Sequence, residues 1–189
     1  MLILGFLTLH AQSKFGAGIK AGPHINIHLS LFDDDRSFVA FHGGAYAHYF
    51  IFNFLAVQPE ILLALKGEKL DSDMGTTKWL LTYIDVPVLL RFQIASFFSI
   101  SAGPQFGYLI RAREKREVND SKFNLGIEDR YKDFDIGLAF GTEFSLPNGI
   151  YLTPHFILGI TDVNNGFYGD SEKKNSMLQL SVGYRIKGR

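Results

Sequence analysis

Hydrophobic and polar residues alternate along most of the chain with a period of two. The clearest run covers residues 13–31, where the odd positions hold Phe15, Ala17, Ile19, Ala21, Pro23, Ile25, Ile27, Leu29 and Leu31. Successive side chains of a β-strand point to opposite faces, so the run predicts a strand with one apolar and one polar face. It is much longer than the roughly 5–6 residues usual for strands of soluble proteins, and this length is compatible with a strand that crosses a membrane.

Seven further segments repeat this pattern: residues 37–50, 54–66, 79–93, 97–111, 133–146, 150–161 and 175–185. The connections alternate between tight turns at 51–53, 94–96 and 147–149 and long charged loops at 67–78, 112–132 and 162–174, with 32–36 a shorter member of the long set. Short turns on one side and long loops on the other are typical of outer-membrane barrels. The pattern predicts an all-β fold, an eight-stranded antiparallel up-and-down transmembrane β-barrel, with both termini in the periplasm.

A soluble lipid-binding barrel is the alternative fold, and it would reverse the polarity by placing the apolar face inside. A strand sheet in hydrocarbon must close on itself, because unpaired backbone groups cost several kcal/mol each. The main objection is that prolines 23, 59, 87, 104 and 154 fall within the predicted strands. Each proline removes one ladder donor, and we interpret these positions as bulges or strand ends.

The first eleven residues differ from the rest of the chain. Residues 2–9 are a short apolar run, and Ala11 is a small residue at which a signal peptidase could cut. We expect residues 1–11 to be part of a signal peptide and residues 12–189 to form a single barrel domain. A buried first strand or helix is the alternative.

Composition removes several classes of function. The chain has 19 basic and 19 acidic residues, which gives no electrostatic attraction to nucleic acid. It has no cysteine, which excludes a disulfide framework and a thiolate metal site. Within the predicted mature chain, no continuous apolar stretch reaches the roughly 18–20 residues of a membrane-spanning helix.

Five phrases of the sequence resemble those of a known family. They are Gly16-Ala17-Gly18-Ile19-Lys20-Ala21-Gly22, Gln58-Pro59-Glu60-Ile61, Tyr83-Ile84-Asp85-Val86-Pro87-Val88-Leu89-Leu90-Arg91, Ala102-Gly103-Pro104 and Val182-Gly183-Tyr184-Arg185. Through them the chain resembles the PorT-like outer-membrane β-barrel proteins of Bacteroidota over nearly all of its predicted mature length. The resemblance implies an eight-stranded barrel in the outer membrane. One founding member is associated with the type IX secretion system, and most relatives have no assigned activity.

The predicted inward positions carry a nearly balanced set of charges. An eight-stranded barrel is only just wide enough for side chains to fill it, so charges inside it must pair with each other. We therefore expect a polar network in the lumen that fixes the barrel, and Lys66 is a further charge predicted to point inward. Its predicted members are Lys20, Glu60, Asp85, Arg91, Asp135, Glu143 and Arg185. A channel that conducts protons or small solutes is the alternative.

The long segment after the predicted fifth strand begins with a basic run. Arg111, Arg113, Lys115 and Arg116 are candidates for contact with an anion or a partner, such as lipopolysaccharide phosphates or a protein. The alternative is a solvated strand extension above the membrane. Aromatic residues at the two predicted rims indicate interfacial girdles. These are Trp79, Tyr108, Tyr131 and Phe134 at the outer rim and Tyr49, Phe92, Phe98, Phe144 and Tyr184 at the inner one.

The histidines offer weaker candidates for chemistry. His24 and His28 would lie about 13 Å apart on one strand, too far to bind one metal ion. His28 and His42 could be opposite each other near Asp33 and Asp35, but that register is only a hypothesis, and no serine motif marks a nucleophile for a hydrolase. We therefore expect no catalytic residue, no metal site and no cofactor.

The sequence predicts a non-enzymatic outer-membrane barrel with a structural or partner-binding role, linked to secretion or envelope assembly. The expected partners are outer-membrane lipid, including lipopolysaccharide, and an envelope or secretion-system protein. No nucleic acid is expected. A small-solute channel and a soluble lipid-binding barrel are the alternative functions.

Overall fold

The computed structural model describes residues 14–27, 39–72, 75–118, 121–166 and 174–186. The expected signal peptide at 1–11, His28 and the acidic segment at 33–35 therefore lie outside the described residues. The strands are β1 (Phe15–Asn26), β2 (Val39–Phe52), β3 (Leu55–Ser72), β4 (Gly75–Ala95), β5 (Phe98–Val118), β6 (Ser121–Gly126), β7 (Phe134–Ser145), β8 (Ile150–Gly159) and β9 (Met177–Ile186). A short 3-10 helix, η2 (Glu128–Arg130), follows β6.

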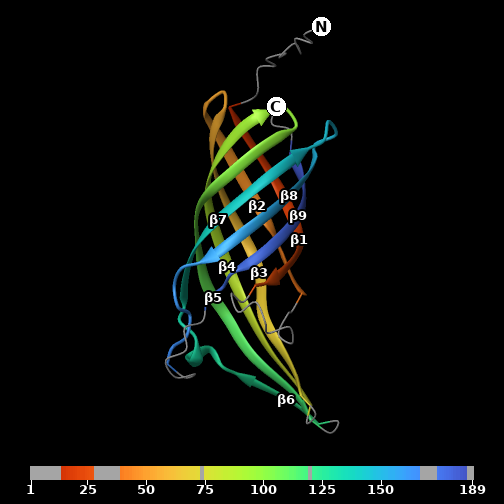
Figure 1. Cartoon of the computed structure of the whole chain (residues 1–189), viewed down its shortest axis with the longest axis vertical. Helices are drawn as coiled ribbons and strands as arrows, with labels where there is room; N and C mark the ends of the chain where they lie inside the picture. Colours follow the sequence, from red (N-terminus) through yellow and green to blue (C-terminus); the bar gives the residue numbers. More distant parts are fainter. Residues whose placement is uncertain (1–13, 28–38, 73–74, 119–120, 167–173, 187–189) are drawn as a thin grey trace.

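Eight of these strands close into a ring. Each strand pairs antiparallel with its neighbours in the order β4-β3-β2-β1-β9-β8-β7-β5, and the pairing of β4 with β5 completes the circle (Figure 1). This confirms the predicted eight-stranded antiparallel barrel. Within the described part of the chain, no helix is both long and apolar enough to cross a membrane.

Burial alternates along the strands in the way the sequence pattern predicts. The exposed face carries large apolar side chains, among them Phe41, Leu63 and Phe134, which are 60%, 54% and 69% exposed. The buried face instead carries charged and polar side chains such as Lys20 and Asp85. This polarity is the reverse of a soluble barrel, so the soluble lipid-binding alternative does not fit the fold.

Two of the predicted long loops are largely strand. β3 and β4 keep one register as far as Ser72 opposite Gly75, and β5 pairs with β6 as far as Val118 opposite Ser121. Residues 67–72 and 75–78 and most of 112–126 therefore continue the ladder. The charges of these segments indicate an environment of water, and a strand pairs as well there as in the membrane.

We call this part of the sheet the extension. It consists of residues 67–72 of β3, 75–82 of β4, 111–118 of β5, and β6. Figure 1 shows it projecting at the end of the barrel away from the two labelled termini. The predicted basic run at Arg111, Arg113, Lys115 and Arg116 therefore lies on a paired strand of the extension.

The five strand prolines do not lie at strand ends, and the three register shifts lie elsewhere, at 50/52, 82/83 and 93/95. Each proline is in register with one neighbouring strand, while the ladder with its other neighbour is interrupted. Pro23, for example, lies opposite Phe41 of β2, but the β1–β9 register passes from Ala21 directly to His24. A strand residue donates its N–H toward one neighbour only, so a proline interrupts one side of the ladder.

Glycines allow the narrow ring to close where a neighbouring backbone comes near. A Cβ on Gly22 would overlap the carbonyl oxygen of Leu180, and one on Gly44 would overlap that of Ile61. Small barrels bend sharply, and glycine at the bend lets the next strand approach.

We predict that Gly44→Ala destabilises the barrel by about 1–3 kcal/mol, because the added methyl group displaces the backbone of β3. Urea-induced unfolding in detergent micelles, followed by the gel-mobility shift between folded and boiled protein, measures this. Gly43→Ala is the control, since its Cβ would approach only the Cβ of Ala21, at 3.3 Å. Equal losses for the two variants would contradict the explanation.

Candidate functional site

The lumen near the short turns is held by one carboxylate that faces two arginines. Arg91 Nη2 lies 2.6 Å from Glu143 Oε1, and Arg185 Nη2 lies 2.5 Å from the same oxygen. Arg91 also donates to Ser99 Oγ at 3.0 Å and to Gln93 Oε1 at 3.1 Å. The side chain of Arg91 is 2% exposed, so protein groups replace the water around its guanidinium.

Farther along the lumen the cations are lysines. Lys20 Nζ lies 2.5 Å from Glu60 Oε2, and both side chains are buried. Lys66 Nζ contacts two carboxylates, at 3.0 Å from Asp85 Oδ1 and 3.3 Å from Asp135 Oδ2. The same ammonium lies 4.3 Å from the ring centre of Tyr83, a cation–π contact.

These contacts bring the seven predicted network residues together as three ion-paired groups. The first joins Arg91, Glu143 and Arg185, the second Lys20 and Glu60, and the third Asp85 and Asp135. Sequence reasoning placed Lys66 inside but left it out of the network, although it is the cation that joins the two aspartates.

A serine and two histidines also meet in the lumen, which the sequence did not reveal. His42 Nε2 lies 2.7 Å from Ser181 Oγ, and His42 Nδ1 lies 3.3 Å from His24 Nδ1. Ser181 is fully buried inside the barrel, and the second nitrogen of His42 faces a histidine where a catalytic base would have a carboxylate. Since 139 positions separate His42 from Ser181, only the strand register could have predicted this contact.

Metal chemistry finds no support in the same region. Among the described residues, no group of three or more histidine, aspartate or glutamate side chains could hold a metal ion. His42 lies opposite Gly22 in the β1–β2 register. The proposed pairing of His42 with His28 involves a residue outside the described ranges.

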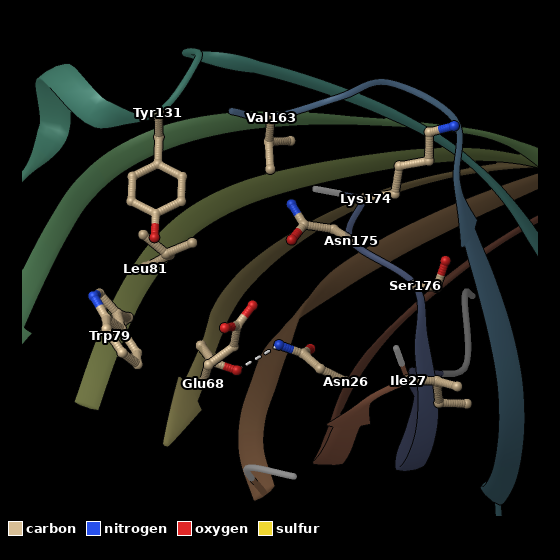
Figure 2. Close-up of a pocket in the computed structure, with 11 residues that line it drawn as sticks. Asn26, Ile27, Glu68, Trp79, Leu81, Tyr131, Val163, Lys174, Asn175 and Ser176 are labelled. Carbon is tan, nitrogen blue, oxygen red and sulfur yellow. Dashed lines mark hydrogen bonds between the residues drawn. The ribbon is translucent and has the colours of Figure 1, made fainter. Parts of the chain in front are cut away.

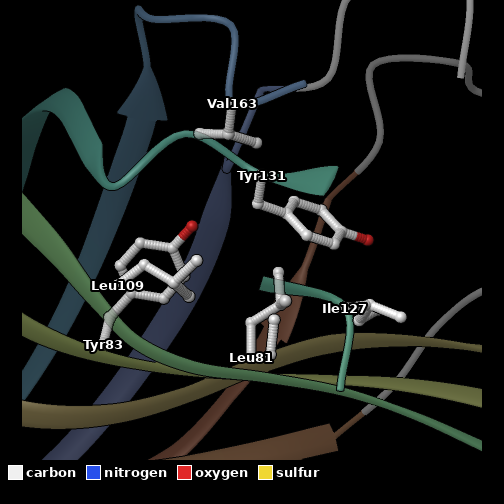
Figure 3. Close-up of a cluster of buried hydrophobic side chains, with 7 residues drawn as sticks. Leu81, Tyr83, Leu109, Ile127, Tyr131 and Val163 are labelled. Atoms are coloured by element: carbon white, nitrogen blue, oxygen red, sulfur yellow. The ribbon is translucent and has the colours of Figure 1, made fainter. Parts of the chain in front are cut away.

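At the end of the lumen away from the tight turns, two segments form a lid. The segment through η2 and the segment after β8 meet at an antiparallel bridge between Tyr131 and Asn164. Backbone hydrogen bonds from Asn165 N to Arg130 O and from Lys132 N to Val163 O join them. Their apolar side chains pack onto those of β4 and β5 in one buried cluster (Figure 3), which consists of Leu81, Tyr83, Leu109, Ala112, Ile127, Tyr131 and Val163.

Two aromatic residues expected in the outer girdle belong to this closure instead. Tyr131 is 5% exposed within the cluster, and Trp79 packs against it. The other two have the exposed position that a girdle requires: Tyr108 and Phe134 are 47% and 69% exposed, and their rings lie 5.2 Å apart. The expectation failed for Trp79 because the odd-numbered residues of β4, to which it belongs, point into the barrel. It failed for Tyr131 because this residue lies in the lid.

A small cavity of about 30 Å³ lies under the lid (Figure 2). Its walls include Asn26, Glu68, Trp79, Tyr131, Asn175 and Ser176. Asn26 spans part of this wall by donating from Nδ2 to Gly67 O at 2.6 Å. The volume suits about two water molecules, so this cavity is too small for an organic ligand.

Two carboxylates fasten the lid to β5. Glu114, which is buried, accepts from Arg130 Nη1 at 2.7 Å and pairs with Arg116. Glu128 Oε1 accepts from the backbone N–H of Ala112 at 3.2 Å. Hydrogen bonds from its own backbone and from Ala112 hold the pKa of Glu128 below its usual value, helped by Arg111 and Arg113.

The four predicted basic contact residues divide between the two faces of the extension. Arg111, Arg113 and Lys115 lie opposite Thr82, Leu80 and Lys78 of β4, on the face that continues the lipid-facing surface. Arg116 lies on the opposite face of the sheet, where it pairs with the buried Glu114. Only the first three can therefore act together on the outside.

Comparison with known proteins agrees with this architecture. A family model described as an outer membrane protein beta-barrel domain matches residues 10–165. The chain belongs to this family. Its location is accordingly the outer membrane. A comparison with the curated proteins found no match.

Solved structures of low identity share the barrel fold. Ail, the attachment invasion locus protein of Yersinia pestis, in complex with the heparin analogue sucrose octasulfate, has a TM-score of 0.56 and 13% identity, covering 92% of this chain and 100% of that chain. Neisserial surface protein A has a TM-score of 0.51 and 17% identity, covering 93% of this chain and 98% of that chain. At these identities the likeness shows the fold alone.

For this member of the barrel family, we predict that Glu143→Leu destabilises the fold by about 3–5 kcal/mol, because it leaves Arg91 buried without its anion. Urea unfolding in micelles measures the loss. Lys132→Met is the control, since it breaks a half-exposed pair with Asp162, at 3.4 Å, and should cost less than about 1 kcal/mol. Similar losses for the two variants would contradict an essential role of the lumen pair.

We also predict that acid loosens the lid at Glu128. A carboxyl whose pKa is lowered by folding stabilises the fold fully above its unfolded pKa, about 4.3, and loses that contribution as the pH falls through the folded value. The protection factor of the Ala112 amide, measured by hydrogen exchange and corrected for intrinsic rates, should therefore fall in that range. Glu128→Gln should remove the pH dependence at this amide, and an unchanged profile in the variant would contradict the prediction.

Proposed function

We propose that this protein is a non-conducting, non-enzymatic barrel with a structural or partner-binding role in the outer membrane, linked to secretion or envelope assembly. The observation that carries the proposal is the filled lumen. Arg91, Lys20 and Lys66, at successive levels, are all buried and paired with carboxylates. An eight-stranded ring with such contents has little width left for a solute path.

The proposal gives the two ends of the barrel different tasks. The tight turns after β2, β4 and β7 lie at one end, and the extension and lid lie at the other. Outer-membrane barrels place short turns in the periplasm and longer structures outside. Both termini would accordingly be periplasmic, residues 1–11 would act as a signal peptide, and the extension would face the exterior, where it meets its partner.

The proposed partner rests on the resemblance of the sequence to a known family. An envelope or secretion-system protein and the surrounding outer-membrane lipid are the proposed partners. The resemblance to PorT-like barrels of Bacteroidota, carried by phrases such as Asp85-Val86-Pro87, supports the link to secretion. The buried lumen network of Lys20, Glu60, Asp85, Arg91, Asp135, Glu143 and Arg185 would hold the barrel rigid beneath the extension.

We predict that the purified barrel, reconstituted in planar bilayers, shows no unitary conductance. The reason is that the ion pairs and the lid close the lumen at several levels. The control is the same preparation tested for the gel-mobility shift on boiling, which establishes that a folded barrel is present. Stable conductance steps from folded protein would overturn the proposal and favour the small-solute channel.

A further inference from the structure

Cations gather in three neighbouring cross-strand rows of the extension. In one row Lys69, Lys78 and Lys115 lie directly opposite one another on β3, β4 and β5, and Asn124 of β6 continues it. The next two rows toward the barrel contain Arg113 opposite Leu80 and Arg111 opposite Thr82. We call these five side chains the basic face: Lys69, Lys78, Arg111, Arg113 and Lys115.

The basic face points in the same direction as the lipid-facing surface. β3 and β4 pair without a register shift from Leu55 opposite Phe92 to Ser72 opposite Gly75. Lys69 therefore lies on the same outward face of β3 as Leu65, and Lys78 lies on the same outward face of β4 as Ile84. Leu65 is 45% exposed on the apolar surface, and Lys69 follows it by four residues, or about 13 Å along the strand.

Few acidic groups offset this charge. Like charges directly opposite in a sheet destabilise it, and the lysine row places three such residues side by side. Three acidic residues border the basic face: Asp71 and Glu117 in the row beyond the lysines, and Glu128 near Arg111 and Arg113. Five cations against three acidic residues leave an excess of positive charge at the basic face.

The lysine row also borders a hollow. A depression of about 330 Å³ is lined by Thr76, Lys78, Lys115, Arg116, Glu117, Phe123 and Asn124. Both lysines directly opposite each other in β4 and β5 are part of its wall. Ammonium groups, together with a threonine hydroxyl and an asparagine amide, can surround a phosphate oxygen from several sides.

We propose that the basic face binds the phosphate groups of a phosphorylated glycolipid, lipopolysaccharide, anchored in the outer leaflet. Lipid is favoured over a soluble anion because the basic face continues the surface that contacts the acyl chains. Long lysine and arginine side chains reach from such positions toward the headgroups. This inference rests on the proposed function, since it requires the extension to lie on the outer side.

The test uses the full-length barrel folded in zwitterionic detergent and titrated with purified lipopolysaccharide, intact or enzymatically dephosphorylated. Each basic residue near an anionic surface contributes about 1 kcal/mol, so removing one lysine should weaken binding about fivefold. Lys115→Gln should show this loss. The matched control is Lys14→Gln, which removes the same charge from an exposed lysine beside Phe50, at the opposite end of the barrel, and should change binding less than about twofold.

The triple variant Lys69→Gln/Lys78→Gln/Lys115→Gln should lose affinity on the order of 100-fold, and 0.5 M salt should reduce the difference from wild type, as it does for exposed charges. Dephosphorylated lipid should bind wild type and triple variant alike. If Lys115→Gln and Lys14→Gln have equal effects, or if dephosphorylated lipid binds wild type as tightly as intact lipid, the inference is wrong. Competition by millimolar inorganic phosphate as effective as that by the lipid would also overturn it, in favour of a soluble anion.

Failure of this inference is distinguishable from failure of the proposed function. The gel-mobility shift on boiling shows whether each variant is folded, and the exposed Lys115→Gln serves if the triple variant does not fold. A conducting wild-type barrel would contradict the proposed function whatever the lysine variants do. A non-conducting barrel whose lysine variants bind lipid as tightly as wild type would contradict only the inference that the basic face binds lipid.

Discussion

Closure of the backbone ladder is the constraint on which the rest of this structure depends. In hydrocarbon every N–H and C=O needs a partner, and the pairing of β4 with β5 supplies the last set. Eight strands enclose a narrow interior, so each inward position must hold either a glycine or a side chain that fits its neighbours. Gly44 leaves room for the carbonyl oxygen of Ile61. Lys66 instead fills its inward position and is neutralised by Asp85 and Asp135.

The same ladder determines what happens outside the membrane. Because β3 and β4 continue without a register shift, the inward and outward faces of the barrel become the two faces of the extension. On β5 the irregularity between Thr82 and Tyr83 of its partner adds one residue, so Leu109 and Ala112 both turn inward under the lid. The alternation of side chains along paired strands therefore decides which charges lie on the outward face of the extension.

The period of two was sufficient to predict the fold and the inward direction of Lys20, Glu60 and Arg91, because parity is a local property of the strand. It did not predict where strands end: residues 67–78 look like a loop since they are polar, yet polar strands pair in water. The period of two also could not predict contacts that depend on how neighbouring strands are aligned. His42 beside Ser181 and Tyr131 within the lid involve partners far apart in the chain, and only the assembled ring brings them together.

Cations on the two faces of this sheet are under different physical demands. A buried ion without a partner costs several kcal/mol, so Lys66 and Arg91 must be neutralised by the protein itself, and the carboxylates are found beside them. On the outward face water screens the charge, so Lys78 and Lys115 can lie opposite each other at a modest cost in stability. In the proposed complex, the phosphates of the bound lipid offset that cost. The alternation of side chains along each strand thus separates the inward cations, which stabilise the barrel through ion pairs, from the outward cations of the proposed binding site.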